Sequence, residues 1–213
     1  MLFILFTLFI ASSIASYGVD LANAVSVDTL VCLCQLGFAN FFIFRAYQSL
    51  GQFDPNAYQN YLNAKETGWT TKNLYSYFYP CLSCGDPEGQ VADYWNNIQA
   101  NGMELGRTFF DIEGNWYDSA SNKAFFESLI NKQRALGFAV GIYSSYYQWE
   151  SIFGLDYTFK YASEYPLWYA HYDSWDSFGD FDAFAGWSYP YMKQYNGDMW
   201  TCNFDVDYNY RED

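Results

Sequence analysis

Basic side chains are scarce in this sequence, and their scarcity restricts what the protein can bind. The 213 residues include 10 lysines and arginines, 24 aspartates and glutamates and a single histidine, which gives a formal net charge of −14. Nucleic-acid binding depends on a positive surface that neutralises phosphate groups. We therefore expect no nucleic-acid partner.

Linker-like and repeated segments are also missing. The chain shows no Pro- or Ser-rich stretch, no internal repeat, no long block of like charge and no Asn-x-Ser/Thr glycosylation signal. About half of the residues (51%) are hydrophobic, which at this length is enough for one substantial core and too little for two ordinary ones. We predict one folded domain over residues 16–213.

A long apolar run occurs only at the N-terminus. Residues 1–15 (MLFILFTLFIASSIA) lack charged side chains and place the small residues Ser13 and Ala15 at the −3 and −1 positions before Ser16. This pattern predicts a signal peptide that is cleaved after Ala15. An uncleaved anchor or a buried first helix is the alternative, although the run is short for a membrane span. Cleavage would leave the protein secreted, or in a lysosome-like or vacuolar lumen, without membrane attachment.

Five cysteines are present: Cys32, Cys34, Cys81, Cys84 and Cys202. In an oxidising compartment they predict at least one disulfide, and the odd number leaves one cysteine without an intramolecular partner. Cys81 and Cys84 also have the spacing of half a zinc site or of a redox motif. Because His171 is the only histidine and Cys32 and Cys34 do not suit a second half-site, we favour structural sulfur and predict no metal and no cofactor.

Strand-like and helix-like segments alternate from residue 17 onward, which is typical of α/β proteins. The predicted strands cover residues 17–21, 39–47, 73–80, 107–113, 138–144, 166–172, 186–195 and 204–210. The predicted helices cover residues 25–35, 55–67, 88–101 and 119–136. The last strands follow one another too closely for full helices between them. We predict a single irregular β/α barrel, similar to a TIM barrel, whose last strands lack full helices.

Acidic residues occur where several of these strands end. Four acids lie near the end of the first strand, at the end of the fourth and within the last: Asp20, Asp111, Glu113 and Asp207. Functional groups of β/α barrels sit at the C-terminal ends of the strands. Asp111 and Glu113 are two residues apart, so their side chains point to one face, with Cα atoms roughly 6.5 to 7 Å apart.

Two carboxyl groups around one bond are what glycoside hydrolysis needs. One protonates the leaving oxygen, and the other stabilises or captures the positive centre. An Asp-x-Glu pattern alone is commonly a solvated strand end. The apolar residues RTFF at 107–110 make this strand a buried one, so its acidic end requires a reason. Aromatic residues form 23% of the chain, a surplus that suits a sugar-binding cleft or a Tyr-rich core.

An ordered set of short motifs resembles the glycoside hydrolase 25 (Chalaropsis-type) lysozymes over most of residues 17–210. The motifs are GVD at 18–20, FIFRAYQSLG followed by Asp54 at 42–54, YSYFYP at 75–80, FDIEG at 110–114, VGIYSS at 140–145, LWYAHY at 167–172, KQY at 193–195 and VDYN at 206–209. The segment YPCLSCG at 79–85 is similar to the variant found in protist and nematode members.

The resemblance implies an N-acetylmuramidase that cuts the β-1,4 bond between N-acetylmuramic acid and N-acetylglucosamine in bacterial peptidoglycan. Carried over by position, Glu113 is the general acid/base, and Asp111 is its partner as stabiliser or nucleophile. Asp20 and Asp207 are two further acids of the cleft. Side chains suited to sugar stacking or hydroxyl bonding in groove-lining segments are Arg45 or Tyr47, Tyr77, Tyr79, Tyr143, Trp168, Tyr169 and Gln194. Each could equally be barrel core. The expected partner is the glycan strand of peptidoglycan, bound by a monomer.

Two other functions stay open at this stage. A non-catalytic peptidoglycan- or chitin-binding protein could use the same fold, although the presence of all four acids argues against it. A metal-dependent enzyme is the second, because converging acids suit Mg²⁺ or Ca²⁺. The negative charge would oppose binding to anionic cell walls at neutral pH. This repulsion disappears near the pI of 4.2, so the charge favours an acidic workplace. A role of the charge in solubility explains it equally well.

Overall fold

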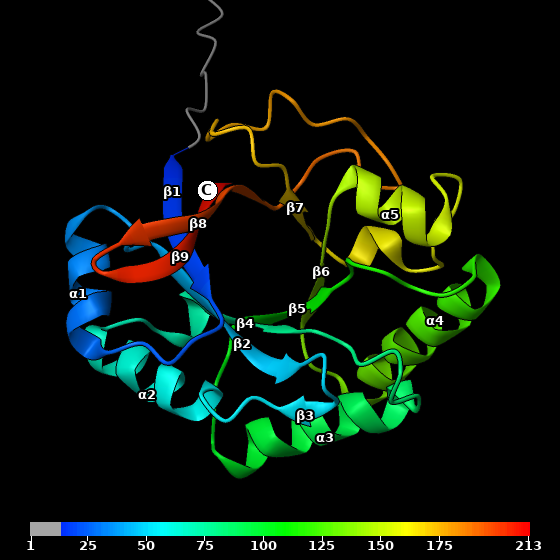
Figure 1. The fold of residues 1–213 in the computed structure, drawn as a ribbon, viewed down its shortest axis with the longest axis horizontal. Helices are drawn as coiled ribbons and strands as arrows, with labels where there is room; N and C mark the ends of the chain where they lie inside the picture. The colour runs from blue at the N-terminus through cyan, green and yellow to red at the C-terminus, as the bar shows by residue number, and fades with distance from the viewer. Residues whose placement is uncertain (1–13) are drawn as a thin grey trace, which may run out of the picture.

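Eight strands close into a barrel in the computed structural model of the protein, which describes residues 14–213 (Figure 1). In ring order they are β1 (Ala15–Leu21), β9 (Phe204–Glu212), β8 (Met192–Thr201), β7 (Leu167–Ala170), β6 (Val140–Ser144), β5 (Arg107–Asp111), β4 (Leu74–Phe78) and β2 (Phe41–Gln48). Pairing of β1 with β2 closes the ring, and β3 (Gln52–Phe53) pairs with β2 outside it. Strand β9 is antiparallel to both neighbours, whereas the other ring contacts are parallel.

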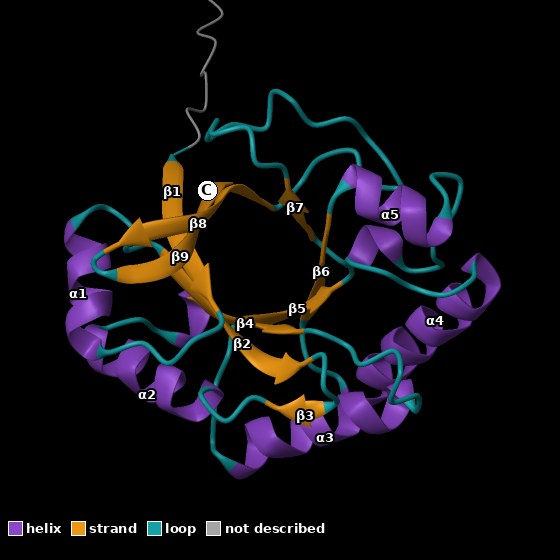
Figure 2. Cartoon of the chain, viewed as in Figure 1, coloured by secondary structure: helices purple, strands orange, loops and turns teal. Residues whose placement is uncertain are grey.

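Helices follow the first strands of the barrel but not the last ones. The α-helices are α1 (Val27–Gln35), α2 (Ala57–Thr67), α3 (Pro87–Ala100), α4 (Ser119–Leu136) and α5 (Tyr146–Phe153), and two 3₁₀ turns span Thr71–Asn73 and Ala162–Glu164. Figure 2 shows loops, without α-helix, in the connections from β7 to β8 and from β8 to β9. The predicted fold class and the bare last strands are therefore confirmed.

Helix α4 shows how local sequence sets an element's ends. The Asp118 side chain accepts hydrogen bonds from the backbone N–H groups of Ala120 and Ser121, which have no partner inside the helix. At the other end Gly137 has a φ of 78°, a left-handed conformation that glycine adopts readily. The observed helix matches the predicted range of 119–136. Helix α5 was not predicted; it begins after Ser145, whose side chain accepts a hydrogen bond from the Gln148 backbone N–H.

The prediction of a strand over residues 186–195 was wrong at its start, because β8 begins at Met192 and continues to Thr201. Pro190 has no N–H to give to a sheet ladder. Trp187 is buried, its Nε1 donates to the Tyr165 carbonyl oxygen at 2.7 Å, and its ring packs edge-on against Trp149 at 5.0 Å. These contacts hold the segment before Met192 in a loop over α5.

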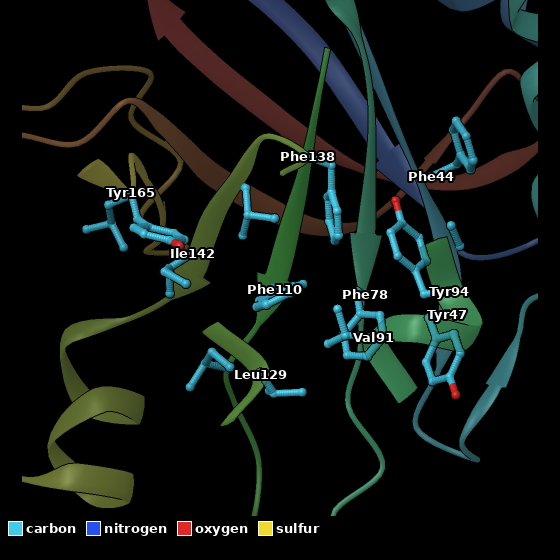
Figure 3. Packing of buried hydrophobic residues seen from close by; sticks show 14 of the residues in the cluster. Phe44, Tyr47, Phe78, Val91, Tyr94, Phe110, Leu129, Phe138, Ile142 and Tyr165 are labelled. Carbon is cyan, nitrogen blue, oxygen red and sulfur yellow. The ribbon is translucent and has the colours of Figure 1, made fainter. Parts of the chain in front are cut away.

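Side-chain alternation along the strands separates two apolar regions. One fills the barrel: Phe41, Ile43, Tyr75, Phe109, Tyr143, Trp168 and Met192. The other, larger region lies between the strands and the helices, and Figure 3 shows part of it, where Phe78 and Phe110 of the barrel meet Val91 of α3 and Leu129 of α4. The inward row ends at the C-terminal rim of the barrel, where it gives way to polar side chains.

Strands β8 and β9 continue beyond the barrel as a hairpin that is fixed at its tip. The two turn residues, Cys202 and Asn203, have φ values of 55° and 59°, as a type I′ turn requires. A disulfide joins Cys202 to Cys32 of α1, 170 residues earlier in the chain. A second disulfide joins Cys81 to Cys84, and Cys34 is unpaired. The prediction of at least one disulfide is confirmed.

The predicted signal peptide falls mainly on residues 1–13, which lie outside the described residues. Ala15, the last residue of that segment, is the first residue of β1 and pairs with Glu212. Cleavage before Ser16 would therefore shorten β1 by one pair. None of the helices described within residues 14–213 is long and apolar enough to cross a membrane.

Candidate active site

A small pocket opens at the C-terminal ends of the barrel strands. It has a volume of about 90 Å³ and is lined by Tyr77, Asp111, Glu113, Tyr143, Trp168, Tyr172, Gln194 and Asp207. These residues come from six different strands or from the residues directly after them. Because the inward side chains of neighbouring strands meet at this rim, residues far apart in sequence share one pocket.

Asp111 and Glu113 both face the pocket, as their spacing predicts. Asp111 is 5% exposed, and its Oδ1 has no hydrogen-bond partner within residues 14–213. Burial, followed by the charges of Glu113 and Asp20, raises the pKa of Asp111 well above its ordinary value, and Arg45 opposes this. Burial and then Asp207 raise the pKa of Glu113. These carboxyl groups can keep protons at a pH where free carboxyl groups are ionised.

Gln194 bridges the other two acids. Its Nε2 donates to Asp20 Oδ2 at 2.8 Å and to Asp207 Oδ2 at 3.0 Å, and its Oε1 accepts from the hydroxyl groups of Tyr143 at 2.6 Å and Tyr172 at 2.8 Å. Because the two tyrosine hydroxyl groups donate to Oε1, the amide nitrogen is the atom that faces the acids. All four hydrogen-bonding positions of the amide are used inside the protein. Gln194 therefore positions the acids and has no donor or acceptor left to bind a sugar.

Asp20 and Asp207 differ in their remaining partners. Asp20 Oδ2 also accepts from Asn209 Nδ2 at 2.7 Å, and Asn209 Oδ1 accepts from Trp168 Nε1 at 2.7 Å. Burial and the charge of Asp207 raise the pKa of Asp20 well above its ordinary value. Burial raises the pKa of Asp207 to about 6, opposed by a hydrogen bond of 2.7 Å from the Asp198 backbone N–H to its Oδ1.

Aromatic rings form the floor and walls of the pocket. Trp168 is 2% exposed and packs edge-on against Tyr143, Phe109 and Tyr77, with ring centroids 4.6, 5.3 and 6.4 Å away. These contacts fix the ring planes before any ligand arrives. Such surfaces suit the C–H faces of a pyranose, while the acids and tyrosine hydroxyl groups suit its polar edges.

Tyr47 and Tyr169 lie outside this pocket. A bulge in β2 between Arg45 and Tyr47 turns Tyr47 into the outer core, where it stacks on Phe78 with ring centroids 4.5 Å apart (Figure 3). Tyr169 neighbours Trp168 on β7 and therefore points to the opposite face, where it packs on Phe181 at 5.0 Å. The prediction that both residues line the groove did not take account of the bulge in β2 or of the alternation of side chains along β7.

Two further predicted residues lie near the acids without lining the pocket. The Tyr79 hydroxyl is 3.0 Å from where a Cβ on Gly114 would lie, and burial, then Asp111 and Glu113, raise the pKa of Tyr79 to about 12. Arg45 forms an ion pair with the buried Asp54, with Nε and Oδ2 2.6 Å apart. Both side chains therefore border the site rather than form its surface.

Sequence reasoning missed two residues of the site: Tyr172, which lines the pocket, and the buried Asn209, which donates a hydrogen bond to Asp20. The alternation that brings Trp168 inward also brings Ala170 and Tyr172 to that face, so the segment LWYAHY contained the signal for Tyr172. Asn209 stands two residues after Asp207 in VDYN, and the same rule places both on one face. Tyr147 and Gln148 line the hollow next to this pocket and were also missed, because they belong to helix α5, which was not predicted.

A second hollow of about 190 Å³ adjoins the pocket. Its lining is Glu113, Tyr143, Ser145, Tyr147, Gln148, Ala170, His171 and Tyr172. Glu113 lies between the two hollows, which together form a cleft. Larger hollows of about 340 and 320 Å³ lie at the N-terminal ends of β5 and β6, but neither brings two acids together. We assign the site to the smaller cleft because its side chains can carry out acid–base chemistry.

The pocket acids do not form a metal-binding group by distance. Within residues 14–213, the only three side chains with ligand atoms within 4.8 Å of one another are His171, Asp173 and Asp180, on the outside of the barrel. The ammonium group of Lys193 lies 2.8 Å from an oxygen of each of these acids. A protein cation already occupies the place of a metal ion in that cluster.

Comparisons with known proteins identify the family of this chain. A family model described as "Lysozyme-like protein 1" matches residues 11–195. The chain is 40% identical over 195 residues to "Probable GH family 25 lysozyme 2" of Dictyostelium discoideum, covering 91% of this chain and 89% of the relative. It is 38% identical over 204 residues to "Lysozyme-like protein 5" of Caenorhabditis elegans, covering 93% and 92%.

The fold is shared with a solved structure of lower sequence identity. The modular endolysin Cpl-1, crystallised with a peptidoglycan analogue, matches with a TM-score of 0.67 at 16% identity, over 95% of this chain and 56% of that one. The relatives in a protist and a nematode confirm the resemblance read from the motifs. The chain belongs to the glycoside hydrolase 25 lysozyme family and is a glycoside hydrolase.

Proposed function

We propose that this glycoside hydrolase cuts the β-1,4 bond between N-acetylmuramic acid and N-acetylglucosamine in bacterial peptidoglycan. The observation that carries the proposal is the pocket in which Asp111, Glu113 and Asp207 surround an aromatic floor with no basic side chain in the lining. Carboxyl groups without a neutralising cation can supply both the acid and the stabilising group of glycoside hydrolysis. The peptidoglycan analogue bound by Cpl-1 supports the same class of substrate.

Glu113 is the proposed general acid/base. It lies between the two hollows of the cleft, so a glycan that occupies both would place a glycosidic oxygen beside its carboxyl group. Its raised pKa keeps a proton available in mildly acidic solution. Glu113 gives this proton to the leaving oxygen as the glycosidic bond breaks and later removes a proton from the attacking water.

Asp111 is the proposed stabiliser of the intermediate. Its unpartnered Oδ1 can accept a hydrogen bond from the N–H of the substrate's 2-acetamido group. The acetamido oxygen then attacks the anomeric carbon while the bond to the leaving oxygen breaks, which forms a five-membered oxazolinium ring. Water later attacks the same carbon and opens the oxazolinium ring, so the configuration is retained. Burial favours the protonated form of Asp111 before substrate binds. The positive charge of the intermediate then favours the ionised form. Direct attack by Asp111 is the alternative route.

An acidic, oxidising compartment is the proposed workplace. The raised pKa values of the pocket acids suit catalysis below neutral pH, and the two disulfides suit an oxidising lumen. Lower pH also reduces the repulsion between a chain of charge −14 and anionic cell walls. A pH–rate profile with its maximum clearly below pH 7 would support this assignment, and a maximum at or above pH 8 would contradict it.

The proposed activity is tested by identifying the products. Protein covering residues 16–213 is incubated with defined peptidoglycan between about pH 4 and 7, and the new reducing ends are identified by mass spectrometry. N-acetylmuramic acid ends are expected. N-acetylglucosamine ends would show a different bond specificity, and glycan that is bound but not cut would indicate a sugar-binding protein. Either result would refute the proposal.

A further inference from the structure

The β8–β9 hairpin continues beyond the barrel (Figure 1), and its two faces carry unlike side chains. On one face Val206 is 1% exposed, and its cross-strand partner Met199 packs on the same core. The other face carries Asp205 and Asp207, and Trp200 is the cross-strand partner of Asp205. Cross-strand partners share a face and side chains alternate along a strand, so Trp200 lies on the same face as Asp207.

This second face is continuous with the pocket. It begins inside the barrel at Asn209, which hydrogen-bonds to Asp20, and reaches the pocket wall at Asp207. Asp205 and Trp200 follow outside the barrel. From strand geometry the Cα atoms of Asp207 and Trp200 are roughly 8 Å apart. A chain that leaves the pocket over Asp207 would therefore meet Trp200 next.

Tyr172 lies against the same strip of hairpin. A Cβ on Gly197 would lie 3.2 Å from Cζ of Tyr172 and 3.5 Å from Oδ1 of Asp207. The absence of a side chain at Gly197 thus lets the Tyr172 ring rest on β8 beside the acid. Tyr172 is 59% exposed and Trp200 is 73% exposed, so two open aromatic side chains extend outward from the pocket.

We propose that Trp200 is the stacking platform of a distal sugar subsite, which binds a pyranose of the same glycan strand outside the pocket. An exposed indole offers a broad apolar face for pyranose C–H groups, and the exposed Asp205 carboxylate beside it accepts hydrogen bonds from hydroxyl groups. This subsite rests on the proposed function, because the continuity of the hairpin face with the pocket identifies its occupant. It favours long glycans over short ones.

The subsite is tested with peptide-free glycan fragments of two lengths. We compare the wild type with Trp200→Ala on a tetrasaccharide and an octasaccharide of alternating N-acetylglucosamine and N-acetylmuramic acid. Trp200→Ala should raise KM about tenfold for the octasaccharide and leave kcat and the tetrasaccharide unchanged, because Trp200 does not touch the reacting atoms. Trp200→Tyr should restore much of the loss. The matched control is Trp175→Ala, which removes an indole that is 71% exposed on the β7–β8 loop.

Each other outcome has a defined meaning. Equal KM values for Trp200→Ala and wild type on the octasaccharide would overturn the subsite, as would an equal loss on both lengths or the same loss in Trp175→Ala. If the wild type cuts neither fragment, the proposed function fails. Calorimetric binding of the octasaccharide then decides the subsite separately: about tenfold weaker binding by Trp200→Ala supports it, and unchanged binding overturns it.

Discussion

Strand β8 presents two consecutive residues to two unlike pairs of acids. Lys193 points outward and is fully buried, with its Nζ 2.8 Å from Asp173 Oδ2 and from Asp180 Oδ1. Gln194 points inward and makes the corresponding bridge to Asp20 and Asp207 at 2.8 and 3.0 Å. The two bridges have nearly equal lengths, but only the outer one carries a positive charge.

Burial and charge together separate the protonation of Asp180 from that of Asp20 and Asp207. Burial alone would raise the pKa of Asp180, but hydrogen bonds from His171 and Lys193 lower it below the ordinary value. In the pocket, burial raises the pKa of Asp207 to about 6 and that of Asp20 well above its ordinary value. A neutral amide thus orders two carboxyl groups without forcing them to ionise. The outer pair stabilises a loop, whereas the inner pair remains available for proton chemistry.

The acids Asp20, Asp111, Glu113 and Asp207 form an inner cluster, and Asp173 and Asp180 belong to an outer one. The largest expected effect comes from removing the proton donor of the inner cluster. Glu113→Gln should lower the turnover of peptidoglycan by at least about a thousandfold, because the amide cannot protonate the leaving oxygen. Folding and glycan affinity should be largely retained. The matched control is Asp180→Asn in the outer cluster, which should keep most of the activity per folded molecule. Substantial turnover by Glu113→Gln would remove Glu113 from the proposed role.

A second substitution gives the inner cluster the charge of the outer one. In Gln194→Lys a cation faces Asp20 and Asp207, and an opposite charge at this distance lowers a carboxyl pKa by about 1 to 3 units. We expect turnover near pH 6 to fall about a hundredfold, and the alkaline limb of the pH–rate profile to move to lower pH because the acids ionise earlier. An unshifted profile would show that the neutrality of Gln194 does not set their protonation.

The isosteric variant Gln194→Glu separates charge from shape. A protonated glutamic acid can still donate to one of the acids, whereas the ionised form would repel both. Its activity relative to wild type should therefore rise as the pH falls. A ratio that is constant across pH would mean that Gln194 serves only to fill space.

Removing the outer charge should affect stability more than chemistry. Lys193→Gln leaves Asp173 and Asp180 facing each other without the lysine cation, and we expect the free energy of unfolding at pH 7 to fall by about 2 to 3 kcal/mol. This is below the full cost of breaking a buried pair, since both acids are partly exposed. Urea unfolding measures the change. A loss in turnover as large as that of Gln194→Lys would contradict the division between the two clusters.

The smallest expected effect is a gain in stability. The pKa of Asp20 is raised in the folded protein, so the folded state binds more protons than the unfolded state above the ordinary pKa, and stability is lost as the pH rises from there. Asp20→Asn removes this charge and should raise the free energy of unfolding at pH 7 by about 1 kcal/mol, with no gain below about pH 4. Turnover should fall less than in Glu113→Gln; an equal loss would give Asp20 a direct catalytic role.

Local patterns predicted most of the fold and the position of the main acids. Helix α4 was predicted to its ends because its cap residues are local, and the two-residue spacing of Asp111 and Glu113 placed both on one face. The hydrogen bond from Gln194 to Asp20 was not predictable, because 174 residues separate the two and only the closure of the barrel brings them together. Tyr47 was misplaced because a bulge changes the alternation that a sequence shows.

The central claim is that Asp20 and the three acids of the pocket hold protons at a pH where Asp180 of the outer pair has already lost its own. It is tested most directly by carbon-13 NMR titration of the side-chain carboxyl groups from about pH 3 to 8. We predict that Asp20, Asp111, Glu113 and Asp207 titrate above their ordinary values and Asp180 below its own. If the pocket acids instead ionise together with the solvent-exposed acids, the neutral bridge at Gln194 does not preserve a proton for catalysis.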